Sequence, residues 1–142
     1  MAMGVGVRKA AADLAAAQSL PKVLRAACVA ADIAESAATA LARASIVDGP
    51  GYLVAADAFA VVRVDLHGFA EDPPVGFLVA DDIGIPSHEE LTELGSRLRD
   101  RLHEVQSVAT GEVAVAIANA NMAARDAVRA LFGSARDDVD IR

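Results

Sequence analysis

Three ionisable side chains alternate with apolar ones in the stretch VVRVDLH, where Arg63, Asp65 and His67 occupy every second position. In a β-strand, alternate side chains share one face and stand about 6.6 Å apart. On such a face Asp65 would orient His67 as a general base, and Arg63 would bind an anionic substrate. The same alternation is typical of the solvated face of a half-buried strand, and the spacing does not favour catalysis over that interpretation.

Two further groups of polar residues have the types that bind ligands or metals. Asp81 and Asp82 stand between a predicted strand and a predicted helix, where ligand and Mg²⁺ contacts are frequent. Adjacent carboxylates point to opposite sides of an extended chain, so a turn into the helix explains them equally well. His88 and His103 are about 22 Å apart on one predicted helix, too far to share a metal ion within one chain. We therefore expect both histidines to be exposed and predict no metal site. No sequence motif indicates a cofactor.

The single cysteine, Cys28, excludes an intramolecular disulfide. It lies among alanines in a predicted helix. A small buried hydrophobic side chain and a reactive thiol are both consistent with this position, and the first is the usual state of such a cysteine.

Composition limits the partners and the compartment. The 142 residues suit a single domain, with 54% hydrophobic residues, 23% charged residues and a net charge of −7. The basic residues are scattered among acidic ones, which argues against nucleic acid and against an anionic membrane surface. No apolar run is long enough to span a bilayer, and the first residues do not read as a signal peptide, so we expect a cytoplasmic protein.

Helix signals are clear in three places. Residues 5–18 and 21–45 are rich in alanine, and Ser19 and Pro21 mark the start of the second segment. Residues 87–105 begin with Ser87 and Glu90 in the spacing of a capping box, and a leucine repeat follows on one face.

Strand signals occupy the middle of the chain. Residues 52–56, 59–66 and 75–80 are rich in β-branched and aromatic residues, and the short links between them predict antiparallel pairing. Residues 111–132 suit either a strand or a helix, and their length and end signals favour a helix. The expected fold class is therefore α+β, with a three-stranded or four-stranded antiparallel sheet packed by alanine-rich helices in the order ααβββαα. We expect residues 134–142 to be a frayed tail.

A row of small side chains along residues 21–45 suggests how the protein functions. The row steps by three and four residues, which is typical of a seam that packs closely against a second helix. With no other segment of equal length in sight, self-association is the simplest way to cover it. The seam comprises Val23, Ala26, Ala30, Ile33, Ala37, Ala40 and Ala44.

Three functions remain open at this level. The first is a non-catalytic homo-oligomeric interaction or structural module. The second is a small-molecule sensor or carrier with a pocket between the sheet and residues 87–105, lined by Tyr52, Phe59, Phe69 and Phe77. The third is a small enzyme that uses His67 and Asp65 as an acid/base pair.

Overall fold

The computed structural model describes residues 5–45, 49–70 and 87–140, with side chains to residue 132. These residues form helices that are joined by short turns or by parts of the chain outside the described residues. The helices are α1 (Val5–Ala16), α2 (Leu20–Ala44), α3 (Gly49–His67), α5 (His88–Gln106) and α6 (Gly111–Asp140).

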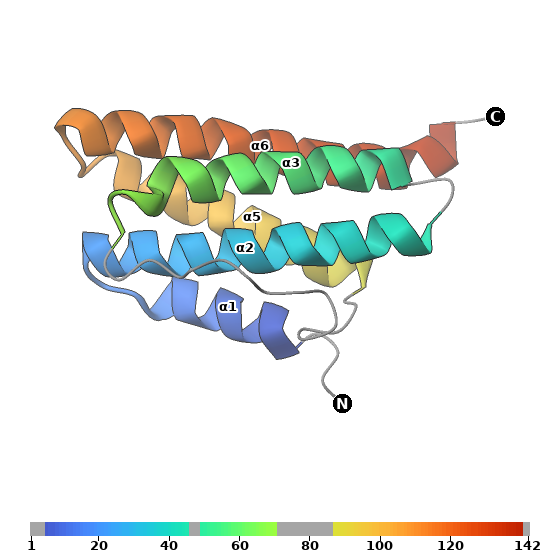
Figure 1. Cartoon of the computed structure of the whole chain (residues 1–142), viewed down its shortest axis with the longest axis horizontal. Helices are drawn as coiled ribbons and strands as arrows, with labels where there is room; N and C mark the ends of the chain where they lie inside the picture. Colours follow the sequence, from blue (N-terminus) through green and yellow to red (C-terminus); the bar gives the residue numbers. More distant parts are fainter. Residues whose placement is uncertain (1–4, 46–48, 71–86, 141–142) are drawn as a thin grey trace.

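Four of these helices form an antiparallel bundle, shown in Figure 1. Around the bundle, α2 packs against α3, α3 against α6, α6 against α5, and α5 against α2. Each neighbour in this ring runs in the opposite direction to the helix beside it. The short helix α1 lies outside the ring, where it contacts both α2 and α5. The core is the interior of the ring, with a smaller apolar layer beneath α1.

Helix α2 packs against three neighbours, α1, α3 and α5, and 13 of its 25 residues are buried. It begins after Ser19, whose backbone has the extended geometry of an N-cap, and Pro21 stands in the first turn where a missing N–H costs nothing. Its alanines allow helices to approach closely on several sides, so small side chains build much of the core.

Side chains from α3 and α5 meet across the centre of the ring. These helices are diagonal and run in the same direction (Figure 1). The Tyr52 hydroxyl lies 2.9 Å from His88 Nδ1, and a Cβ on Gly95 would stand 3.2 Å from Phe59 Cζ. In each pair the two partners are 36 residues apart in sequence. The two helices therefore keep the same register over about two turns.

The start of α5 confirms the predicted capping box. Ser87 Oγ accepts a hydrogen bond from the Glu90 N–H at 3.1 Å, and the Ser87 N–H donates to Glu90 Oε1 at 3.0 Å. The leucine stripe of α5 faces the core, as expected. Near its other end, the Arg101 guanidinium donates hydrogen bonds to the carbonyls of Leu14 and Ala17, which fixes the end of α1 on α5.

The predicted α+β fold class is wrong. No strand occurs in residues 5–45, 49–70 or 87–140, and the segments 52–56 and 59–66 both belong to α3. The third expected strand, 75–80, lies outside the described residues. Helix α3 resembled strands because apolar side chains occupy its outer face as well as its inner face, which hides the helical period.

The other helix predictions are confirmed. Residues 5–18, 21–45 and 87–105 correspond to α1, α2 and α5, and residues 111–132 are helical. The helical backbone of α6 continues to Asp140, through most of the segment that we expected to be frayed.

Candidate functional site

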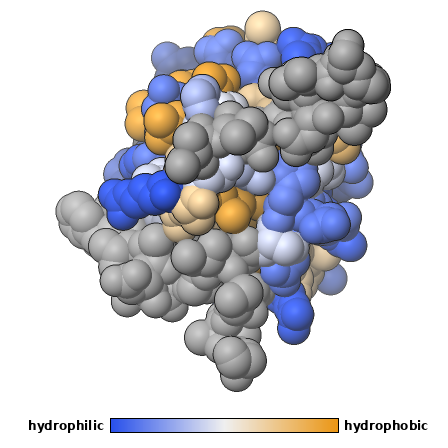
Figure 2. Space-filling view, turned by 90° about the vertical axis from the view of Figure 1, so that its right-hand side faces the viewer, coloured by the Kyte–Doolittle hydropathy of each residue, from blue (hydrophilic) through white to orange (hydrophobic). Residues whose placement is uncertain are grey.

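The outward-facing side of α3 is largely apolar. Over its central turns the exposed positions are Leu53, Val54, Asp57, Val61 and Val64, which we call the α3 outer face. The exposed fractions of its four apolar residues are 52%, 57%, 47% and 66%. Figure 2, which views one end of the bundle, shows hydrophobic side chains open to solvent at the upper left, where α3 lies. Apolar residues that recur along one exposed helix face are typical of an interaction surface.

The predicted catalytic residues are not brought together. Successive residues of a helix are rotated by about 100°, so positions two apart point in different directions. Arg63 points toward α2, whereas His67 is exposed in the last turn of α3. Asp65 is half-buried on another side of the helix. The proposed Asp65–His67 pair depended on a strand, and this helical geometry removes its basis.

Arg63 instead belongs to an ionic cluster between α2 and α3. Its Nη2 atom donates to Glu35 Oε1 at 2.9 Å, and its Nε atom lies 3.8 Å from Asp32 Oδ1. Asp32 is only 5% exposed, so it needs a nearby cation to remain charged. Arg63 Nε is buried and makes no hydrogen bond within the described residues. This cluster fixes α3 against α2.

Cys28 is fully buried beside this cluster, as expected of a small hydrophobic side chain. Burial raises the pKa of its thiol from 9.0 to about 11, while Arg63 lowers that pKa and Asp32 raises it. The thiol is therefore protonated at neutral pH and shielded from solvent. A reactive nucleophile would need the opposite environment.

Three of the predicted ligand-binding residues, Tyr52, Phe59 and Phe69, lie in the part of the chain that the structure describes. Tyr52 and Phe59 are buried core residues, and Phe69 lies partly exposed in the turn after α3. Tyr52 makes an edge-on ring contact with His88, with centroids 5.9 Å apart. The remaining candidates, Phe77, Asp81 and Asp82, lie outside the described residues.

The small-residue seam of α2 is covered within the chain. Six of its members are buried in the single chain, whereas Ala44, in the last turn of α2, is exposed. A seam that already has intramolecular neighbours does not require a second subunit. Burial of the seam within one chain therefore removes the reason that the seam gave for self-association. The six buried members are Val23, Ala26, Ala30, Ile33, Ala37 and Ala40.

Open cavities flank α1 on its α5 side and on its α2 side. A groove of about 550 Å³ runs between α1 and α5, with Ala11, Ala15 and Leu94 among its lining residues. Most of its charges are engaged: Arg8 lies 3.7 Å from Glu90, and Arg97 lies 2.6 Å from Glu93. Another cavity, of about 400 Å³, lies between α1 and the first turns of α2.

Some kinds of site are missing from the described part of the chain. Its histidine, cysteine and acidic side chains form no group of three or more that could hold a metal ion. Of the helices in residues 5–140 that the structure describes, none is both long and apolar enough to cross a bilayer. His103 is exposed, as predicted. His88 is half-buried, so the prediction of an exposed side chain is met only in part there.

Sequence reasoning missed the α3 outer face. The signal was present in residues 53–64, where Leu53, Val54, Val61 and Val64 repeat at helical spacing. It was not recognised because Val62 falls between these residues and Leu66 follows them, both on the buried face, so the segment has the valine-rich appearance of strands.

Comparisons with known proteins give this surface no precedent. No family model matches the chain, and neither a curated protein nor a solved structure does so at a significant level.

Proposed function

We propose that this chain is a non-catalytic helical module that pairs with a second copy of itself through the α3 outer face. The observation that carries the proposal is the row of exposed apolar residues Leu53, Val54, Val61 and Val64. Leaving these side chains in water forgoes roughly 25 cal/mol for each Å² of apolar surface, and pairing removes that penalty.

The arrangement of the row supports a second copy as the partner. Leu53 and Val54 precede Asp57 on this face, and Val61 and Val64 follow it, so the row has apolar residues at both ends and one charge near its middle. Two such helices packed antiparallel about a twofold axis would each present apolar residues to apolar residues. This self-complementarity is what an isologous interface needs.

The size of the row limits the affinity. From Leu53 to Val64 the row is about 17 Å long, and a single helix face is about 10 Å wide. That footprint is well below the roughly 800 Å² per partner of a standard interface, even if the flanking helices add to it. We therefore expect a dissociation constant on the order of 1–100 µM.

Sedimentation velocity over a concentration series tests the proposal with a matched pair of variants. Val61→Asp places a charge within the row and is expected to weaken the dimer at least tenfold, because the carboxylate would be desolvated against apolar side chains. Val108→Asp changes a valine that is 70% exposed in the turn after α5, outside the row, and is expected to leave the dimer unchanged. A wild-type chain that stays monomeric up to several hundred micromolar would refute the proposal.

Asp57 provides a test of the twofold geometry. In the antiparallel pair it lies close to its own symmetry mate, so the two carboxylates repel each other. Asp57→Asn is expected to tighten the dimer about two- to fivefold. Glu89→Gln, which makes the same change in net charge on α5, is the control and is expected to have little effect. Equal tightening by both variants would point to general charge repulsion and would contradict the twofold arrangement.

A further inference from the structure

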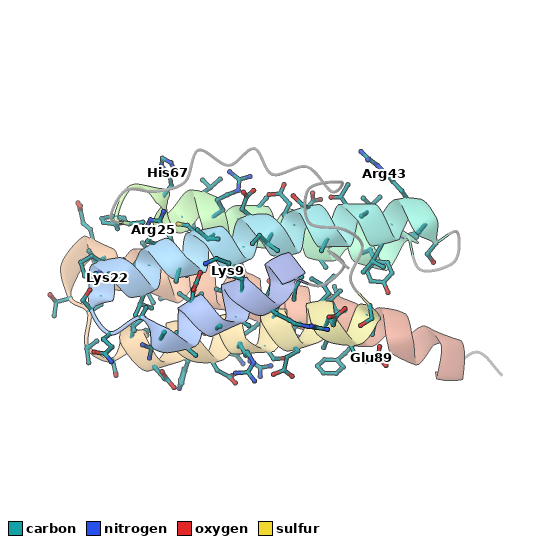
Figure 3. All side chains as sticks on the ribbon, turned by 90° about the horizontal axis from the view of Figure 1, so that it is seen from below. Lys9, Lys22, Arg25, Arg43, His67 and Glu89 are labelled. Atoms are coloured by element: carbon teal, nitrogen blue, oxygen red, sulfur yellow. The ribbon has the colours of Figure 1, made fainter. Side chains whose placement is uncertain are left out.

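The cavity between α1 and α2 combines apolar walls with positive charge. On the α1 side it is lined by Asp13, Ala16 and Ala17, and on the α2 side by Lys22, Arg25 and Val29. Its volume, about 400 Å³, falls within the range of pockets that bind small molecules. Figure 3 shows Lys22 and Arg25 near the first turns of α2. The cavity lies between α1 and α2, and its described lining contains no residue of α3.

The charges around the cavity favour an anion. Asp13 is the acidic residue of the lining, and Lys9 Nζ holds its carboxylate at 2.9 Å. Lys22 has no ion-pair partner within the described residues. The first turn of α2 contains no acidic residue, so its positive end adds to the charge of Lys22. The cavity is thus locally positive in a chain whose net charge is −7.

We propose that this cavity binds a small amphipathic monoanion, namely a short aliphatic carboxylate. The carboxylate would pair with Lys22, with Arg25 close by, and the aliphatic chain would lie along Ala16, Ala17 and Val29. A single negative charge matches Lys22, the cation that has no competing ion pair in the described residues. The apolar walls explain why the ligand carries a hydrocarbon body and is not a bare inorganic ion.

Titration with hexanoate, followed by the amide signals of ¹⁵N-labelled protein, tests the proposal. We expect saturable shifts at residues that line the cavity. Affinity should rise about fourfold for each methylene added from propionate to hexanoate, because each buried methylene contributes a fixed increment. Hexylamine and 1-hexanol have the same chain without the negative charge, so each should bind at least fivefold more weakly than hexanoate. Hexyl phosphate tests whether the charge or the carboxylate shape is recognised, and a tighter fit for the phosphate would overturn the monoanion assignment.

Variants locate the site. Lys22→Gln removes the proposed partner of the carboxylate and should weaken hexanoate two- to fivefold, the range expected for one partly exposed ion pair. Arg43→Gln is the matched control, because Arg43 lies at the opposite end of the same helix (Figure 3), and it should leave affinity unchanged. Ala16→Leu fills the cavity from an exposed position and should reduce chain-length dependence without removing charge.

Three further results would overturn the proposal. They are absence of saturable shifts at 20 mM hexanoate, equal binding of hexanoate and hexylamine, and equal weakening by Lys22→Gln and Arg43→Gln. None of these results affects the α3 interface, because Lys22 and Ala16 lie outside it. Sedimentation of the Lys22→Gln variant should match that of the unchanged chain.

Discussion

At the scale of single residues, the contact between Phe59 and Gly95 decides how closely α3 and α5 approach across the bundle. A Cβ at position 95 would lie 3.2 Å from Phe59 Cζ and 3.3 Å from Val128 Cγ2. Gly95→Leu should therefore destabilise the fold by about 1–3 kcal/mol, which urea unfolding measures. Gly95→Ala should change stability by less than about 1 kcal/mol, because better helix propensity offsets the crowding.

A second substitution shows whether this crowding is the cause. In a Phe59→Leu background the ring is gone, so Gly95→Leu should cost clearly less than it does in the unchanged chain. If the two substitutions are additive, the close approach of Phe59 does not set the requirement for glycine.

Cys28 gives the molecule a predictable response to alkaline pH. Its pKa is about 11 in the folded chain, against 9.0 for an unperturbed thiol. Because the folded pKa is raised, its contribution is fully present below pH 9 and is lost as pH rises toward 11, where the unfolded thiol ionises first. The loss should reach about 2–3 kcal/mol. In Cys28→Ala, the free energy of unfolding should fall less between pH 8.5 and 11 than in the unchanged chain. An equal fall in both chains would contradict the role of the Cys28 thiol in this pH dependence.

At the scale of elements, the two helix starts after Ser19 and Ser87 differ in a testable way. Ser87 makes both bonds of a capping box, whereas Ser19 makes no side-chain cap hydrogen bond and α2 has no acid in its first turn. Ser19→Asp should stabilise the fold by about 0.3–1 kcal/mol through the helix dipole. Thermal unfolding measures the change. Ser87→Ala should destabilise by about 1 kcal/mol, while Ser19→Ala should be nearly neutral.

The same scale shows which elements the sequence could predict. The start of α5 was predictable because its signals are local: Ser87, Glu90 and a leucine repeat all indicate one helix. Helix α3 was not, because its amphipathic period is hidden by Leu53, Val54, Val61 and Val64 on the outer face. A helix that is apolar on opposite sides is expected to be buried or to bind a partner. The four apolar residues of the proposed interface therefore all lie in the segments that were misassigned as strands.

At the scale of the whole molecule, α2 explains why the small-residue seam was misinterpreted. Its period was read correctly, but one sequence does not show which neighbours cover a helix. Val23, Ala30 and Ala37 are buried in the single chain, where α2 packs against α1, α3 and α5. Similarly, Arg63, Asp65 and His67 were predicted to share one face because they alternate, and the helix turns them to different sides. Spacing predicts a shared face only when the secondary structure is right.

The central claim is that two copies meet through their α3 outer faces. Single cysteines introduced in a Cys28→Ala background test it most directly, using a short bismaleimide cross-linker at 50 µM protein. Asp57→Cys should yield a covalent dimer, because the twofold axis places each new thiol near its symmetry mate, and Val108→Cys should remain largely monomeric. Equal cross-linking at the two positions, or none at Asp57→Cys, would rule out this arrangement.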